Sequence, residues 1–296
     1  MNTKNNAVMW GAALVALSAL GYSTNPIFGK FAYQAGATAV SMLAIRYSLG
    51  TIGLWALLGA RGEGRGLTLA RRLQMLTLGV GMGLVSLLYF VALEHIGASL
   101  ATGLFYTYPA FVAIVGLMRG EGLTRLGLAG LLLTAAGTWL LLGTNLGGFT
   151  WGGALLILAA SGLYTLYMVI SEPWTKGVAP TVSATYVTTG AAVVYLTLAL
   201  VTRPPAPGLG AYLAGGGLAL CSTIFALVTF FAGLPRVGPT RAAIISTLEP
   251  VFTALLAAVA LHEHLSLLQV GGILLVVAGA VAAQQKERTE VAPEEA

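Results

Sequence analysis

Long apolar segments separated by short polar breaks follow one another along nearly the whole chain. The breaks are charged or rich in proline and glycine, as in ARGEGRG at 60–66 and TRPPAPG at 202–208. A bilayer core of about 30 Å needs roughly 20 apolar residues per helix, and the segments are about that long. Nine breaks predict ten spans. Their expected limits are 8–29, 38–60, 73–93, 98–118, 125–144, 150–171, 180–201, 209–232, 239–260 and 267–284.

Composition points to lipid as the solvent of this chain. Only 8% of the 296 residues are charged, 57% are hydrophobic, and the mean hydropathy is +0.86. A typical soluble domain carries about 25% charged residues. So few charges would not cover a water-soluble fold of this size, so we predict an all-α integral membrane protein. The net charge of +5 does not indicate a nucleic-acid partner, because the charges lie between apolar segments.

The distribution of lysine and arginine predicts the orientation. With the N-terminus inside, 12 of the 15 basic residues lie in cytoplasmic segments. The outer loops hold only Lys30 and Arg203, and Arg46 lies within the second span. Because basic residues favour the cytoplasmic side, we expect a multi-pass protein with both termini in the cytoplasm. The first apolar segment lacks a clear signal-peptide cleavage site and is expected to be a retained span.

The chain matches itself when it is shifted by 141 residues. Eight residues between 10 and 24 and seven between 90 and 113 meet identical residues in the second half. We therefore expect five-helix repeats at 1–145 and 146–285, followed by a short disordered cytoplasmic tail at 286–296. Five is odd, so the second repeat enters the membrane inverted. Inverted repeats are typical of secondary transporters. An old duplication kept only for stable packing is the alternative.

Several stretches carry a resemblance to a known family. The stretches that carry the resemblance are WGAALVALSALGYSTNPIFGK, AIRYSLG, LYFVALEHIGASLATGLFYTYPAFVAI and FFAGLPRVGPTRAAIISTLEPVFTALLAAVALHEHLSLLQVGGILLVVAGA. Through them, the chain resembles the EamA branch of the drug/metabolite transporter (DMT) superfamily. The resemblance covers nearly the entire chain. Within that branch, the chain looks most like the amino-acid exporters of the YddG type.

The resemblance implies an arrangement and an activity. Spans 1, 3, 4, 6, 8 and 9 would surround a central cavity, with spans 5 and 10 behind them as supports. Amino acids, including aromatic ones, would be exported from a bacterial cytoplasm across the inner membrane. The basic pairs that grip phosphate in related sugar-phosphate exchangers are not apparent in mid-span, which argues against such a substrate.

Three prolines are predicted to act as hinges. Pro109 and Pro250 occupy equivalent places in the fourth span of each repeat, and Pro26 follows Asn25 in the first span. A proline cannot donate to the carbonyl four residues earlier, so it bends its helix.

Glu249 is the strongest single candidate for function. It corresponds to Tyr108 in the first repeat, so the fold does not require an acid there. Ionisable groups inside spans are energetically expensive and usually face a cavity or a partner. Glu249 could attract the ammonium group of a substrate or carry a proton. The structural alternative is a protonated side chain bonded to a neighbouring helix. Arg46 is expected to be a structural anchor whose long stem reaches outward to the membrane surface, with substrate binding as the alternative.

Aromatic and hydroxyl side chains gather near the middle of several spans. This mixture suits a small amphipathic solute. Ordinary packing and interfacial aromatic belts are the alternative. The predicted substrate-binding residues are Tyr22, Asn25, Tyr89, Phe105, Tyr108, Tyr164, Ser222, Phe225, Thr229, Ser246 and Glu249.

Other function classes find no support in the sequence. The three histidines fall at span ends, so no catalytic constellation is visible and we expect no enzyme. HEH at 262–264 does not have zinc-binding spacing, so no metal is expected. A nucleotide-binding loop is missing, so neither a cofactor nor an ATPase subunit is predicted. Two transport functions stay open, amino-acid export by alternating access and efflux of organic cations or drugs. Proton coupling and facilitated diffusion are both compatible with the sequence.

Overall fold

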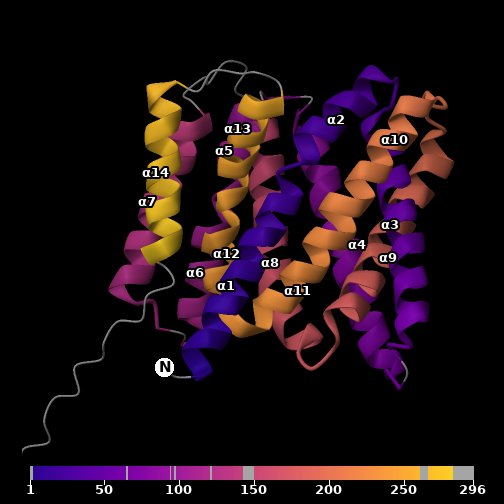
Figure 1. Cartoon of the computed structure of the whole chain (residues 1–296). Helices are drawn as coiled ribbons and strands as arrows, with labels where there is room; N and C mark the ends of the chain where they lie inside the picture. Colours follow the sequence, from indigo (N-terminus) through magenta and orange to yellow (C-terminus); the bar gives the residue numbers. More distant parts are fainter. Residues whose placement is uncertain are drawn as a thin grey trace, which may run out of the picture.

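The computed structural model describes residues 3–64, 66–93, 95–96, 98–120, 122–142, 150–260 and 266–282, and every regular element in these ranges is helical (Figure 1). The first half contains α1 (Thr3–Tyr22), α2 (Asn25–Gln34), α3 (Ala39–Arg61), α4 (Leu69–Leu93), α5 (Ala98–Phe105), α6 (Tyr108–Met118) and α7 (Arg125–Leu142). The second half contains α8 (Trp151–Thr175), α9 (Pro180–Thr202), α10 (Leu209–Leu218), the π-helix η1 (Ala219–Phe225), α11 (Ala226–Val237), α12 (Pro239–Ser246), α13 (Leu248–Ala260) and α14 (Leu267–Ala282). The predicted all-α fold is confirmed.

Every predicted span coincides with helix, although the helices differ in length and continuity. Six stretches of the described chain are long and apolar enough to cross a membrane. They are Asn6–Gln34, Ala39–Arg61, Leu69–Tyr89, Trp151–Thr175, Pro180–Thr202 and Leu209–Val237. The other four predicted spans correspond to the broken pairs α5–α6 and α12–α13 and to the shorter helices α7 and α14. For these four, membrane crossing stays a prediction.

The helix contacts are nearly unchanged when the two halves are exchanged. The packing of α1 against α11 has its counterpart in α8 against α4, and α4 against α9 is matched by α10 and η1 against α3. The equivalent helices α7 and α14 pack on each other. In Figure 1, α5 lies above α6 whereas α12 lies below α13, so these equivalent broken helices run in opposite directions. The halves are therefore inverted repeats.

Glycines permit the close approach of α7 and α14, which stand together at one side of the bundle in Figure 1. A Cβ on Gly137 would lie 2.7 Å from the carbonyl oxygen of Gly272. A Cβ on Gly279 would lie 2.6 Å from the carbonyl oxygen of Gly130. Because small residues let helix backbones approach closely, α7 and α14 pack tightly against each other.

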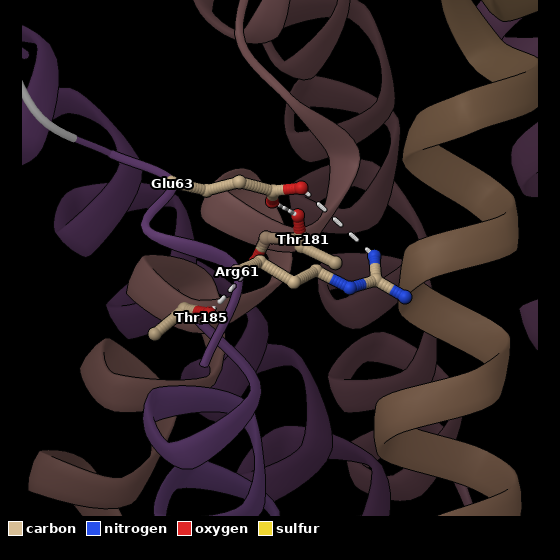
Figure 2. A network of polar contacts seen from close by, with 4 residues as sticks. All are labelled: Arg61, Glu63, Thr181 and Thr185. Carbon is tan, nitrogen blue, oxygen red and sulfur yellow. Dashed lines mark hydrogen bonds and ion pairs between the residues drawn. The ribbon is translucent and has the colours of Figure 1, made fainter. Parts of the chain in front are cut away.

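A polar network joins the end of α3 to the start of α9 (Figure 2). The hydroxyl of Thr181 donates to the Glu63 carboxylate, and Arg61 lies 4.0 Å from the same carboxylate. The Thr185 hydroxyl donates to the carbonyl of Thr181 at 2.7 Å. The ion pair is solvent-exposed and contributes little to stability. Its geometry connects the two repeats at one end of the bundle.

Some predicted features lie outside the described residues. They are the tail at 286–296, the histidines His262 and His264, and the chain between 143 and 149 where the two repeats were expected to join.

Candidate functional site

Four helices are irregular, and contacts bring the irregular segments together. Turns separate α1 from α2, α5 from α6, and α12 from α13, while η1 interrupts the helix between α10 and α11. Pro26, Pro109 and Pro250 each follow one of the turns by two or three residues. Because proline lacks an N–H, each leaves the carbonyl four residues earlier without its helical partner. Irregular backbone at membrane depth is tolerated only inside protein or along a cavity, so this level of the bundle is the candidate site.

Hydroxyl groups connect the α1–α2 turn to η1 and α13. Thr24 and Ser222 share a hydrogen bond of 3.0 Å between their hydroxyl oxygens. Ser222 also donates to the carbonyl of Gly21 at 3.2 Å. From α13, the Thr253 hydroxyl donates to the carbonyl of Ser23 at 3.4 Å. The turn in the first span is thus held by side chains of the second repeat.

Arg46 points into the protein and binds η1. Its Nε donates to the Thr223 hydroxyl at 2.9 Å and its Nη2 to the Ser222 carbonyl at 3.1 Å. The guanidinium also lies 5.1 Å from the centre of the Tyr47 ring. Only 8% of Arg46 is exposed. The expected outward reach to the membrane surface is therefore wrong, because η1 offers a hydroxyl and a carbonyl closer at hand.

Aromatic rings from α4, α5, α6 and α8 form one continuous cluster. Phe105 is at its centre, with ring centroids 5.6 Å from Tyr89, 5.6 Å from Tyr108 and 5.4 Å from Tyr164. Tyr108 and Tyr164 meet edge to face at 4.8 Å. Tyr106 lies 6.2 Å from Phe105. Such contacts add to the stabilisation from burial and present both π faces and hydroxyls.

Glu249 adjoins this cluster from α13. The Tyr106 hydroxyl and the Arg46 guanidinium both lie close enough to the Glu249 carboxylate to interact with its charge. Four further tyrosines lie within electrostatic range of it, namely Tyr22, Tyr89, Tyr108 and Tyr164. Glu249 also occupies the first turn of α13, where the helix dipole favours a negative charge. The break before Pro250 creates that helix start, so Glu249 lies at the positive end of a helix.

The structure brings most of the predicted binding residues together in two adjoining groups. Tyr22, Tyr89, Phe105, Tyr108, Tyr164, Ser246 and Glu249 belong to the aromatic group. Asn25 follows the α1–α2 turn, and Ser222 of η1 bonds to that turn. The Asn25 Oδ1 is buried without a hydrogen-bond partner among the described residues. Whether each of these side chains binds a substrate stays a prediction.

Phe225 and Thr229 lie elsewhere. Phe225 packs against the backbone of Gly21 and is 42% exposed. The Thr229 hydroxyl donates to the carbonyl of Phe225 at 2.8 Å. These contacts place the two side chains at the junction of α1 with η1 and α11.

Two positions close to the site were missing from the predicted binding set. Tyr106 lies close to the carboxylate of Glu249. Thr107 shares a hydrogen bond of 3.1 Å with the fully buried Ser161 of α8. Both residues form the turn just before Pro109. Pro109 itself was the sequence signal. A proline in mid-span breaks its helix, and the residues two and three positions before it then form a turn that contacts neighbouring helices.

Metal chemistry has no obvious location within the described ranges, where no three His, Cys, Asp or Glu side chains come together as metal ligands. The arrangement instead offers one carboxylate, several aromatic faces and three helices that begin beside it.

Comparison with known proteins agrees with this geometry. Residues 9–143 and 151–283 each match the EamA-like transporter family. The uncharacterised transporter YcbK of Bacillus subtilis is 28% identical over 91% of this chain and 92% of its own. An uncharacterised transporter of Archaeoglobus fulgidus is 29% identical over 66% of this chain and 71% of its own. A solved crystal structure at 23% identity shares the fold, with a TM-score of 0.78 over 94% of this chain and 97% of its own. The chain therefore belongs to the EamA-like transporter family, whose named relatives are transporters and not enzymes.

Proposed function

We propose that this transporter exports amino acids, including aromatic ones, and related small metabolites across the bacterial inner membrane by alternating access. Both termini would be cytoplasmic. The observation that carries the proposal is the carboxylate of Glu249 beside Tyr106 and a ring of further tyrosines, at the level where four helices are irregular.

Each part of an amino acid finds a complementary group. The ammonium group would pair with Glu249, and an apolar or aromatic side chain would lie against the Phe105 cluster. The carboxylate would face the starts of α2 and α6, whose N-cap residues Thr24 and Thr107 make no side-chain cap bond. Positive ends of broken helices bind anionic substrate groups in other transporters.

Movement would use the helix breaks. The turns before Pro26, Pro109 and Pro250 leave fewer backbone hydrogen bonds to hold each helix straight. The glycine-packed pair α7 and α14 would stay fixed behind them. One carboxylate in the site is compatible with carrying a proton or with binding substrate only.

Efflux of organic cations is a second candidate, and one observation favours it. The hydrogen bonds of Arg46 go to η1, so a cation among the neighbouring tyrosines could pair with the Glu249 carboxylate. Aromatic rings around a carboxylate also suit quaternary ammonium groups.

Uptake into liposomes containing the full chain tests both candidates. Labelled phenylalanine, methionine, threonine and tetraethylammonium are compared with and without a pH gradient. Saturable phenylalanine uptake without a gradient supports an amino-acid facilitator. Uptake that requires the gradient supports proton coupling. Transport of tetraethylammonium alone moves the function to cation efflux.

We expect Glu249→Gln to lower uptake about ten-fold or more while the protein still folds, because a charge-assisted contact with the ammonium group is lost. Glu249→Asp keeps the charge and should retain more activity. Glu172→Gln, at the far end of α8, is the matched control and should leave uptake unchanged. Unchanged kinetics in Glu249→Gln would remove Glu249 from the site.

A further inference from the structure

A crevice of about 160 Å³ lies behind two of the broken helices, on the side of the support helix α7. Thr107 and Pro109 line it from the α5–α6 break, and Thr247 lines it from the α12–α13 break. Leu132, Thr138 and Trp139 of α7 form the opposite wall.

The crevice opens on an exposed face of α7 and ends in the protein interior. At its rim, Leu132 is 62% exposed and Ala135 is also exposed. At its inner end, Thr138 and Thr247 are 1% and 2% exposed. Because α7 belongs to a membrane protein, a molecule dissolved in the bilayer has access to this opening.

One hydroxyl on the wall has no partner. Thr138 Oγ1 is buried and makes no hydrogen bond to any described residue. The hydroxyls of Thr107 and Thr247 donate to backbone carbonyls at 2.7 and 2.6 Å. A buried polar group without a partner is unfavourable, so an occupant that bonds Thr138 would be stabilised.

Thr138 is also a feature of one repeat only. In the second repeat, Ala280 stands at the equivalent place on α14. The packing of α7 against α14 therefore does not require a hydroxyl there.

We propose that this crevice binds a small lipophilic phenol or alcohol that enters from the bilayer. Its hydroxyl would bond Thr138, and its apolar body would lie against Trp139, Pro109 and the leucines of α7. The volume fits, since a cavity of about 150 Å³ accommodates benzene. Tyr106 lines this crevice and also lies close to Glu249, so an occupant would contact a residue of the candidate transport site.

Heavy-atom quenching of Trp139 fluorescence measures binding directly in vesicles containing the full chain. The probes are 4-bromophenol and 4-bromotoluene, which differ in the hydroxyl, with concentrations referred to the bilayer. We expect saturable quenching that is lost in Trp139→Phe, and half-saturation at about five-fold lower concentration for the phenol. Quenching that rises without saturation, or that is equal for both probes, would overturn the proposal.

Substitutions at α7 and at a distant threonine complete the test. Thr138→Val should abolish the preference for bromophenol, and Thr138→Ser should preserve it. Ala135→Phe should block the opening and remove saturable quenching. Thr188→Val is the matched control, because Thr188 on α9 also has a buried hydroxyl without a partner among the described residues. A preference that survives in Thr138→Val refutes the site. Since binding is the readout, the test does not depend on the proposed transport activity.

Discussion

At the scale of single residues, two opposite charges inside the membrane region have different surroundings. Arg46 is enclosed and donates to a hydroxyl and a carbonyl of η1. Glu249 is only partly buried, starts a helix and has Tyr106 as a neighbour. A cation that is fully engaged by the protein holds structure, whereas a carboxylate among aromatic rings is open to a solute. The hydrogen bonds of Arg46 position η1. Substrate binding by Glu249 stays a proposal.

Removing the Arg46 charge should loosen the protein. We expect Arg46→Gln to destabilise the fold by about 1.5–3 kcal/mol, because hydrogen bonds from a charged donor to buried groups are lost. Thermal unfolding in detergent would show this as a lower midpoint. Arg46→Lys should lie in between, since lysine lacks the planar fork. Lys30→Gln, at an exposed position, is the control. An unchanged midpoint in Arg46→Gln would contradict the anchoring role.

At the scale of helices, prolines have two different effects. Pro109 and Pro250 follow breaks that divide their spans into two helices. Pro173 lies within α8 without dividing it. Local side-chain bonds support the two breaks, since the hydroxyls of Thr107 and Thr247 donate to the carbonyls of Leu104 and Ile244, three residues earlier. Breaks supported in this way can be kept as permanent flexible points.

Replacing the break-forming prolines tests their hinge role. We expect Pro109→Ala combined with Pro250→Ala to slow substrate exchange several-fold without unfolding the protein, because two backbone donors are restored and both helices stiffen. Initial rates of uptake and counterflow would measure the change. Pro173→Ala should leave the rates as they are. Equal rates in all three proteins would exclude these prolines as hinges.

At the scale of the whole molecule, the inverted repeats give the protein two halves with similar helix packing but different residues in the interior. The contact pattern is shared by both repeats, whereas Arg46 belongs only to the first repeat and Glu249 only to the second. A symmetric frame allows two related conformations, and the asymmetric residues supply chemistry.

Membrane orientation can be checked with introduced cysteines after Cys221→Ser. We expect an impermeant maleimide to label Gln34→Cys, at the exposed end of α2, in intact cells. Lys176→Cys, exposed beyond α8, should react only after permeabilisation. The expectation follows from the excess of basic residues on one side. The reverse pattern would place both termini outside the cytoplasm.

The membrane class, the helix ranges and the inverted repeats could all be predicted from the sequence. These properties depend on local quantities, namely the length of apolar runs, the position of prolines and the alternation of basic residues. The predicted span 38–60 and the observed helix α3 (Ala39–Arg61) differ by only one residue at each end. The agreement is close because a charged or glycine-rich break ends a helix locally.

Only the tertiary structure decided which interior groups meet. Arg46 and Thr223 are 177 positions apart, and their bond requires that α3 pack against a π-helix, an irregularity without a clear sequence signal. Tyr106 joins Glu249 whereas Phe225 does not, although both are mid-span aromatics. Hydropathy places a residue at a depth, but its partners depend on helix rotation and on which distant helix packs beside it. The sequence alone therefore determined at which depth the candidate site lies. The packing of the two repeats decided which residues come together in it.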